Sequence, residues 1–197
     1  MIARHWMFIP FLFGGCLLAC GPLTIRDTAK QEFVPIEGGI LELHREVVIP
    51  AQRTRVFFQD GRASYGINEY YPHCELRVRD ISEQSQTVQA DRFSIERVFG
   101  SVDEIVSSGG IQLAGSVGTT LILGGGGNGN GNGEMRLMYT YFMAMHSDRQ
   151  PHVTYFVCGG AFEEPALADY PTLQDIRTAM GEYATLTLVA DSNDLTN

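Results

Sequence analysis

The sequence predicts a mainly β protein, in which about seven or eight antiparallel strands form a sandwich or a partly open barrel with one short helix near the C-terminus. Three observations predict this class. Apolar and polar residues alternate with a period of two along much of the chain, and clusters of turn residues separate the alternating segments. Helical spacing is confined to one segment close to the C-terminus. An α+β arrangement, with that helix packed on one sheet, is the alternative.

The first strands are predicted from alternation and from the residues that end it. The alternation that begins at Leu41 stops at Pro50, which has no backbone N–H to donate to a neighbouring strand. Asp60-Gly61 is typical of a two-residue hairpin turn, because glycine adopts a positive φ without strain. Strands are expected over residues 41–49, 53–59, 62–67, 74–79 and 87–99. The charged face of the strand at 74–79 is expected to be solvated.

The second half holds the strongest strand signal and the helix. Residues 135–145 are apolar on both faces, which indicates a central, covered strand, and residues 152–159 should form a hairpin with it. Thr172 and Asp175 have the spacing of a capping box, and Gly181 stands where a helix ends. We therefore expect one short helix there, followed by a last strand over residues 183–190.

Composition and charge limit the classes of partner. The 197-residue chain is 44% hydrophobic and 19% charged, which is typical of a globular protein of one domain. Its 14 basic and 23 acidic residues give a net charge of −9. Because an acidic surface repels phosphate and the cations do not cluster, no nucleic acid partner is expected, and anionic lipid headgroups are disfavoured.

The N-terminus predicts export and a lipid anchor. Residues 1–19 combine an early cation, an apolar run and no acid, which is the pattern of a secretory signal peptide. The run ends in Leu17-Leu18-Ala19-Cys20, which resembles the lipobox of bacterial lipoproteins. The resemblance implies that the signal is removed before Cys20 and that this cysteine is acylated, for example with palmitate. Gly21 stands where an Asp would retain such a protein in the inner membrane, so the resemblance implies the periplasmic face of the outer membrane.

Two other interpretations of the N-terminus remain open. Cleavage before Cys16 fits less well, because Phe13 then occupies the first lipobox position. An ordinary signal peptide with a soluble periplasmic product, or an uncleaved anchor, is the other. Beyond the signal we expect a lipidated tether at 20–39, one β-rich domain at 40–190 and a polar tail at 191–197. The body resembles uncharacterised envelope lipoproteins of Gram-negative bacteria, which adds no catalytic residue.

The cysteines of the body predict a disulfide. Cys74 and Cys158 remain after Cys16 is removed and Cys20 is acylated, and an even pair in an oxidising periplasm favours one bond between them. Two buried free thiols are the alternative. A metal site would need two further ligands, and no CxxC or HxxxH spacing is present, so no metal and no cofactor is expected.

Residues 107–133 are rich in Gly and Asn and are predicted to form a mobile loop. Inside it, residues 111–123 are apolar and uncharged, which indicates either a flexible strand pair or a segment that docks elsewhere. The candidate interaction residues in this segment are Ile111, Leu113, Leu121, Ile122 and Leu123. A phosphate-binding loop is disfavoured, because no Gly-Lys-Ser/Thr follows the glycines.

Few residues suggest chemistry. The chain lacks Gly-x-Ser-x-Gly, and His44, His146 and His152 are interpreted as ordinary polar residues at strand surfaces and at a hairpin mouth. Exposed tyrosines often mark contact surfaces, so the loop that holds Tyr65, Tyr70 and Tyr71 is a candidate interaction site. The alternative is that these rings cover the end of the core.

These patterns favour a structural or protein-interaction lipoprotein that contacts another envelope protein through a sheet edge or the tyrosine loop. A module that binds a small ligand or a metal ion is the alternative, and an enzyme is third. A cavity of several hundred cubic ångströms with convergent polar groups would favour the ligand, whereas an open apolar patch would favour a protein partner.

Overall fold

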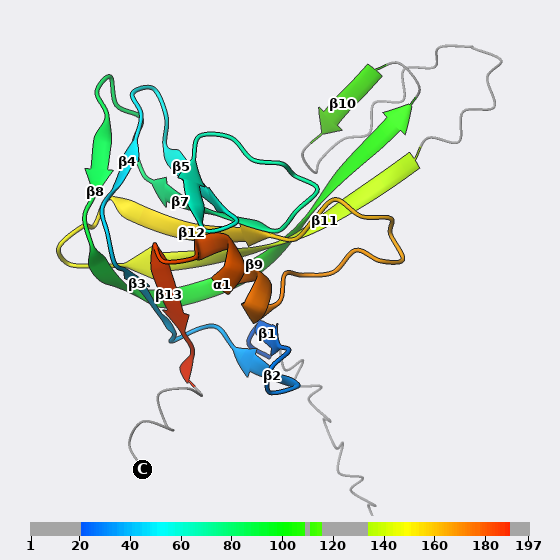
Figure 1. Cartoon of the computed structure of the whole chain (residues 1–197), viewed down its shortest axis with the longest axis horizontal. Helices are drawn as coiled ribbons and strands as arrows, with labels where there is room; N and C mark the ends of the chain where they lie inside the picture. The colour runs from blue at the N-terminus through cyan, green and yellow to red at the C-terminus, as the bar shows by residue number, and fades with distance from the viewer. Residues whose placement is uncertain (1–20, 109–110, 116–133, 190–197) are drawn as a thin grey trace, which may run out of the picture.

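A computed structural model describes residues 21–108, 111–115 and 134–189 of the chain, with backbone alone for 107–108 and 111–115. It confirms the predicted class, because the strands form a curled antiparallel sheet, a half-barrel, with one short helix near the C-terminus (Figure 1). The main sheet has nine strands, and two separate two-stranded pairs flank it.

The strands of the main sheet follow one continuous path, and β9 and β11 lie side by side within it. The order along the path is β13 (Ala184–Thr187), β3 (Ile40–Leu43), β9 (Asp91–Ser108), β11 (Glu134–His146), β12 (Val153–Gly159), β7 (His73–Val78), β5 (Arg55–Gln59) and β6 (Arg62–Ser64). Off this path, β10 (Ile111–Gly115) pairs with β9. The small pairs are β1 (Thr24–Asp27) with β2 (Glu32–Pro35) and β4 (Val47–Ile49) with β8 (Gln86–Val88).

The core lies on one face of the curled sheet, where α1 (Leu173–Met180) and the β1–β2 hairpin pack. The predicted capping box is confirmed, since Asp175 N donates to the Thr172 hydroxyl and Thr172 N donates to the Asp175 carboxylate. Gly181 ends the helix with a φ of 53°, a conformation that a side chain would strain. Leu173, Ile176 and Met180 bring the apolar stripe of the helix into the core.

The segment expected to be a tether is instead largely part of the fold. Residues 24–35 form the β1–β2 hairpin, and Ile25, Val34 and Ile36 are 0%, 4% and 0% exposed in the core. β1 and β2 have four residues each, and an alternation of apolar and polar residues over so short a stretch is hard to recognise in a sequence. The expectation of a tether therefore does not hold over these residues.

Two predicted strands divide into separate strands. The single strand expected at 41–49 is β3 and β4, which belong to different sheets, because the chain leaves the main sheet after Leu43. The strand expected at 87–99 is β8 and the start of β9, and β9 then continues through Gly100 to Ser108. Period-two patterning cannot reveal such a break when the alternation carries on in phase across the corner.

Part of the segment predicted as a mobile loop is strand. β9 runs to Ser108, and β10 pairs antiparallel with it, Ile111 opposite Ser108, which agrees with the strand-pair interpretation for the backbone of these residues. Leu121, Ile122 and Leu123 lie outside the described residues. Whether residues 107–133 move stays a prediction.

The predicted disulfide is confirmed. Cys74 on β7 lies directly opposite Cys158 on β12, with 4.1 Å between their Cα atoms, and both residues are fully buried. The bond closes a loop across 84 residues of sequence, so it constrains the unfolded chain over much of the domain.

Loss of this bond should destabilise the domain. We expect Cys74→Ala to lower the free energy of unfolding by roughly 2–5 kcal/mol, measured by urea denaturation of the soluble domain. Cys158→Ala should cost the same, and the double variant little more than either, because the bond is lost once. Two free thiols in the body of denatured, unreduced wild-type protein would contradict the prediction.

Candidate functional site

The tyrosine loop joins β6 to β7 and is exposed. Tyr65, Tyr70 and Tyr71 are 52%, 49% and 58% exposed, so these rings do not cover the end of the core. Asn68 shapes the loop, because its side-chain oxygen accepts from Tyr70 N and its backbone N–H donates to the amide oxygen of Gln59. The loop therefore presents tyrosine rings outward from an ordered backbone.

The outer half of the β9–β11 pair forms a second candidate surface. We define the arm as residues 102–108 of β9, residues 134–139 of β11 and all of β10. Figure 1 shows the arm extending beyond the body of the domain. β12 pairs with β11 from Thr140 onward, and the segment after β12 still bonds to Tyr139 and Leu137, so residues 134–136 of β11 lie past this neighbour. Val106 and Met135 face each other across the arm and are 42% and 39% exposed.

A cation–π contact joins the arm to the tyrosine loop. The guanidinium of Arg136 lies 5.7 Å from the centroid of the Tyr70 ring, within the range of a cation–π interaction. Arg136 also pairs with the Glu134 carboxylate, with 2.6 Å between Nη2 and Oε1. Arg136 and Ala114 flank Ile105 on its two sides. The loop and the segment that begins at Ile111, far apart in the sequence, thus belong to one region of the molecule.

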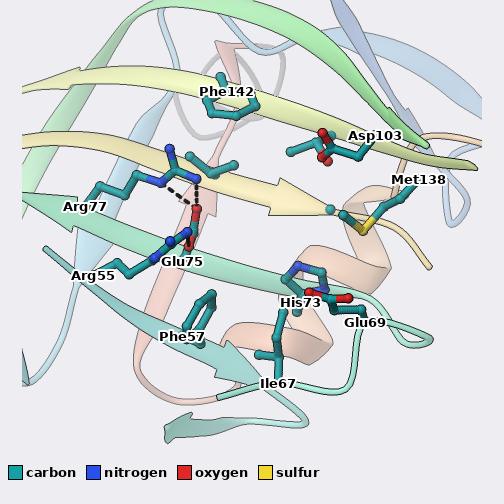
Figure 2. Close-up of a pocket in the computed structure, with 13 residues that line it drawn as sticks. Arg55, Phe57, Ile67, Glu69, His73, Glu75, Arg77, Asp103, Met138 and Phe142 are labelled. Carbon is teal, nitrogen blue, oxygen red and sulfur yellow. Dashed lines mark hydrogen bonds and ion pairs between the residues drawn. The ribbon is translucent and has the colours of Figure 1, made fainter. Parts of the chain in front are cut away.

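A polar pocket of about 270 Å³ lies on the sheet face opposite the core (Figure 2). One end is built around Glu75, which is 4% exposed. Arg55 donates to its carboxylate at 3.2 Å and Arg77 also pairs with it, so the buried charge is compensated. These guanidinium groups also lie over the Phe57 and Phe142 rings, at 5.5 and 5.2 Å from the centroids.

The rest of the pocket combines apolar side chains with several hydrogen-bond acceptors. His73 is 8% exposed, and its Nδ1 lies 3.1 Å from the Tyr71 carbonyl oxygen. Because a carbonyl can only accept, this assigns the proton of a neutral ring to Nδ1 and leaves a lone pair on Nε2. Glu69 and Asp103 add carboxylates to the lining. Thr140 is 4% exposed, and in the described part of the chain its buried hydroxyl has no hydrogen-bond partner.

Sequence reasoning missed this pocket. The charged face of residues 74–79 was expected to be solvated, but Glu75 on that face is buried. The cause is cross-strand: Arg55 lies on β5 and Phe142 on β11, and their side chains reach the neighbouring strands. A charged residue in an alternating strand carries no signal of its own that would reveal such neighbours.

Two of the three histidines singled out in the sequence each have one polar side chain as a partner. His44 Nε2 lies 2.7 Å from the Thr185 hydroxyl, and His146 Nε2 lies 3.1 Å from the Asp148 carboxylate. Among the residues that the structure describes, no group of three or more His, Cys, Asp or Glu side chains is arranged to hold a metal ion.

An open hollow of about 370 Å³ lies beside Asp91 at the start of β9. Burial opposes ionisation of this carboxyl, but hydrogen bonds from Gln150, Ser147 and the Arg92 N–H, together with the Arg149 charge, hold its pKa below the usual value. Gln150, Ser147 and Arg149 all belong to the turn between β11 and β12. The network therefore holds this turn against β9, and this structural role accounts for the burial of Asp91 and its partners Ser147 and Gln150.

Cys20, the predicted acylation site, lies just outside the described residues, which begin at Gly21. Within the described ranges, no helix has the length and apolar character needed to span a bilayer. Comparisons with protein-family models, with curated proteins and with solved structures found no match.

The buried Thr140 hydroxyl, which has no hydrogen-bond partner among the described residues, should lower the free energy of unfolding. We expect Thr140→Val to raise the free energy of unfolding of the ligand-free domain by about 1 kcal/mol or more, because a buried hydroxyl without a partner carries its full desolvation cost. Chemical denaturation measures this. Thr154→Val is the matched control, since the Thr154 hydroxyl donates to the Arg77 carbonyl at 3.4 Å and its removal should bring no gain. A Thr140→Val chain less stable than wild type would contradict the assignment.

Proposed function

We propose that this protein is a lipid-anchored lipoprotein of the bacterial envelope, held at the periplasmic face of the outer membrane through Cys20, and that it serves as a structural or protein-interaction module. The motif Leu17-Leu18-Ala19-Cys20 supports the anchor. The buried Cys74–Cys158 disulfide supports an oxidising compartment, because structural disulfides are rare where thiols are kept reduced.

The observation that carries the interaction function is the arm joined to the tyrosine loop. A narrow ribbon of strands that extends past its supporting sheet has little core to stabilise it. Its exposed apolar residues, Val106 and Met135, lie on the same ribbon as Arg136, which contacts the exposed Tyr70. Apolar side chains, tyrosine and arginine are the composition of protein–protein contact sites.

The partner that fits this region is another envelope protein that presents a strand. A ribbon offers backbone N–H and C=O groups at its edges, and strand addition uses these groups for affinity while neighbouring side chains provide selectivity. The Tyr70 ring lies next to Arg136 of the arm, so a docked partner could contact the arm and the tyrosine loop together. Contact through a sheet edge and contact through the tyrosine loop would then belong to one interface.

Site-specific photo-cross-linking in intact envelopes tests this proposal. A photoreactive side chain at Val106 or at Tyr71 should form a discrete adduct with the same partner protein, because both positions are exposed within the proposed region. The matched control is Gln174, which is exposed on α1 away from the arm. Adducts of equal yield at Gln174, or none at Val106 and Tyr71, would contradict the proposal.

A second candidate is the binding of a small polar ligand in the pocket beside Glu75. Its support is the buried Thr140 hydroxyl without a protein partner, which a ligand could satisfy. Glu69, Asp103 and the lone pair of His73 Nε2 are acceptors, so the ligand would have to donate hydrogen bonds, as an amine does. The comparison of Thr140→Val with Thr154→Val bears on this candidate directly, because a hydroxyl already satisfied within the protein would remove its main support.

A further inference from the structure

The chain is fixed to the domain almost from its first described residue. The Leu23 carbonyl accepts from Ile36 N at 3.3 Å, and the Thr24 carbonyl accepts from the Tyr141 hydroxyl at 2.8 Å. Ile25 follows and is fully buried in the core. Gly21 and Pro22 alone therefore separate Cys20 from backbone that is held in place.

This spacing leaves no room for a spacer between the anchor and the domain. Three peptide steps join Cys20 to Leu23, and a fully extended chain gains at most about 3.6 Å per residue, so the two Cα atoms lie within about 11 Å of each other. Acyl chains on Cys20, the anchor of the proposed function on which this inference rests, hold that residue at the bilayer surface. The start of β1 must then lie at the lipid headgroups.

The hairpin that begins there carries side chains suited to this position. Phe33 on β2 is 69% exposed, the highest value among the large apolar side chains of the described residues. It pairs across the hairpin with Arg26, which is also exposed and can approach lipid phosphates. The acid of the same strand, Asp27, is 4% exposed and accepts from Ala29 N at 2.9 Å, so its charge is turned away from the surface.

We propose that the β1–β2 hairpin is a membrane-contact face, with Phe33 inserted at the boundary of headgroups and acyl chains. An aromatic ring is favoured at this boundary and an arginine at the phosphate level, so the pair stabilises the contact made by the anchor. Figure 1 shows the hairpin below the middle of the body and the arm pointing to the upper right, away from the hairpin. The domain thus rests on the bilayer by the hairpin, and the arm extends away from that contact.

A single-tryptophan variant tests the proposal. Trp6 is the one tryptophan of the sequence and belongs to the predicted signal peptide, so Phe33→Trp gives a mature chain whose sole tryptophan reports on the hairpin. The lipidated full-length mature protein is reconstituted into phosphatidylcholine vesicles with brominated acyl chains. Ile81→Trp is the matched control, because Ile81 is 64% exposed and lies in the turn between β7 and β8.

We expect the emission of Phe33→Trp to shift to shorter wavelength and to be quenched by the brominated lipid at least about twofold more than that of Ile81→Trp, because bromine quenches at short range within the bilayer. Flotation of the same samples with the vesicles reports on the anchor separately. Flotation with equal quenching of the two variants would overturn the membrane-contact face and leave the anchor standing. Protein that lacks acyl chains on Cys20 and does not float would overturn both.

Discussion

The antiparallel pairing of β9 with β11 is the contact on which the rest of the sheet depends. The register runs from Ser94 opposite His146 to Ser107 opposite Glu134. β3 and β10 pair with β9, and β12 pairs with β11. β7 in turn pairs with β12, to which the Cys74–Cys158 disulfide also links it. The pairing is also packed closely: Tyr170 stacks on Tyr141 over Gly100, where an added Cβ would lie 2.0 Å from the Tyr170 hydroxyl oxygen. A side chain at that glycine would displace the ring.

The two halves of this pairing have different physical support. The inner half is part of the body and contributes buried residues such as Phe93 and Met143 to the core. The outer half is the arm, and at its tip, beyond Leu137, Val106 and Met135 stay exposed and backbone pairing does most of the stabilising. Local opening is easier where few apolar contacts must be broken, so the arm is the part of the sheet best suited to rearrange around a partner.

The sequence predicts those features that depend on neighbours along the chain. The capping box at Thr172 and the hairpin at Asp60-Gly61 are local, and both were found, with positive φ at both turn residues. The disulfide followed from an even count of cysteines. Burial of Glu75, the contact of Arg136 with Tyr70 and the fixing of Thr24 by Tyr141 all join residues from distant segments, so no period or spacing in the sequence could reveal them.

The proposed anchor gives these parts a common orientation, with the hairpin at the bilayer and the arm facing away from it. This orientation depends on Cys20 as the first residue of the mature chain. The most direct test is mass spectrometry of the intact protein, and of its N-terminal peptide, isolated from native envelopes. We expect a chain that begins at Cys20 and carries the mass of two or three acyl chains. A mature N-terminus at any other residue, or an unmodified Cys20, would contradict it.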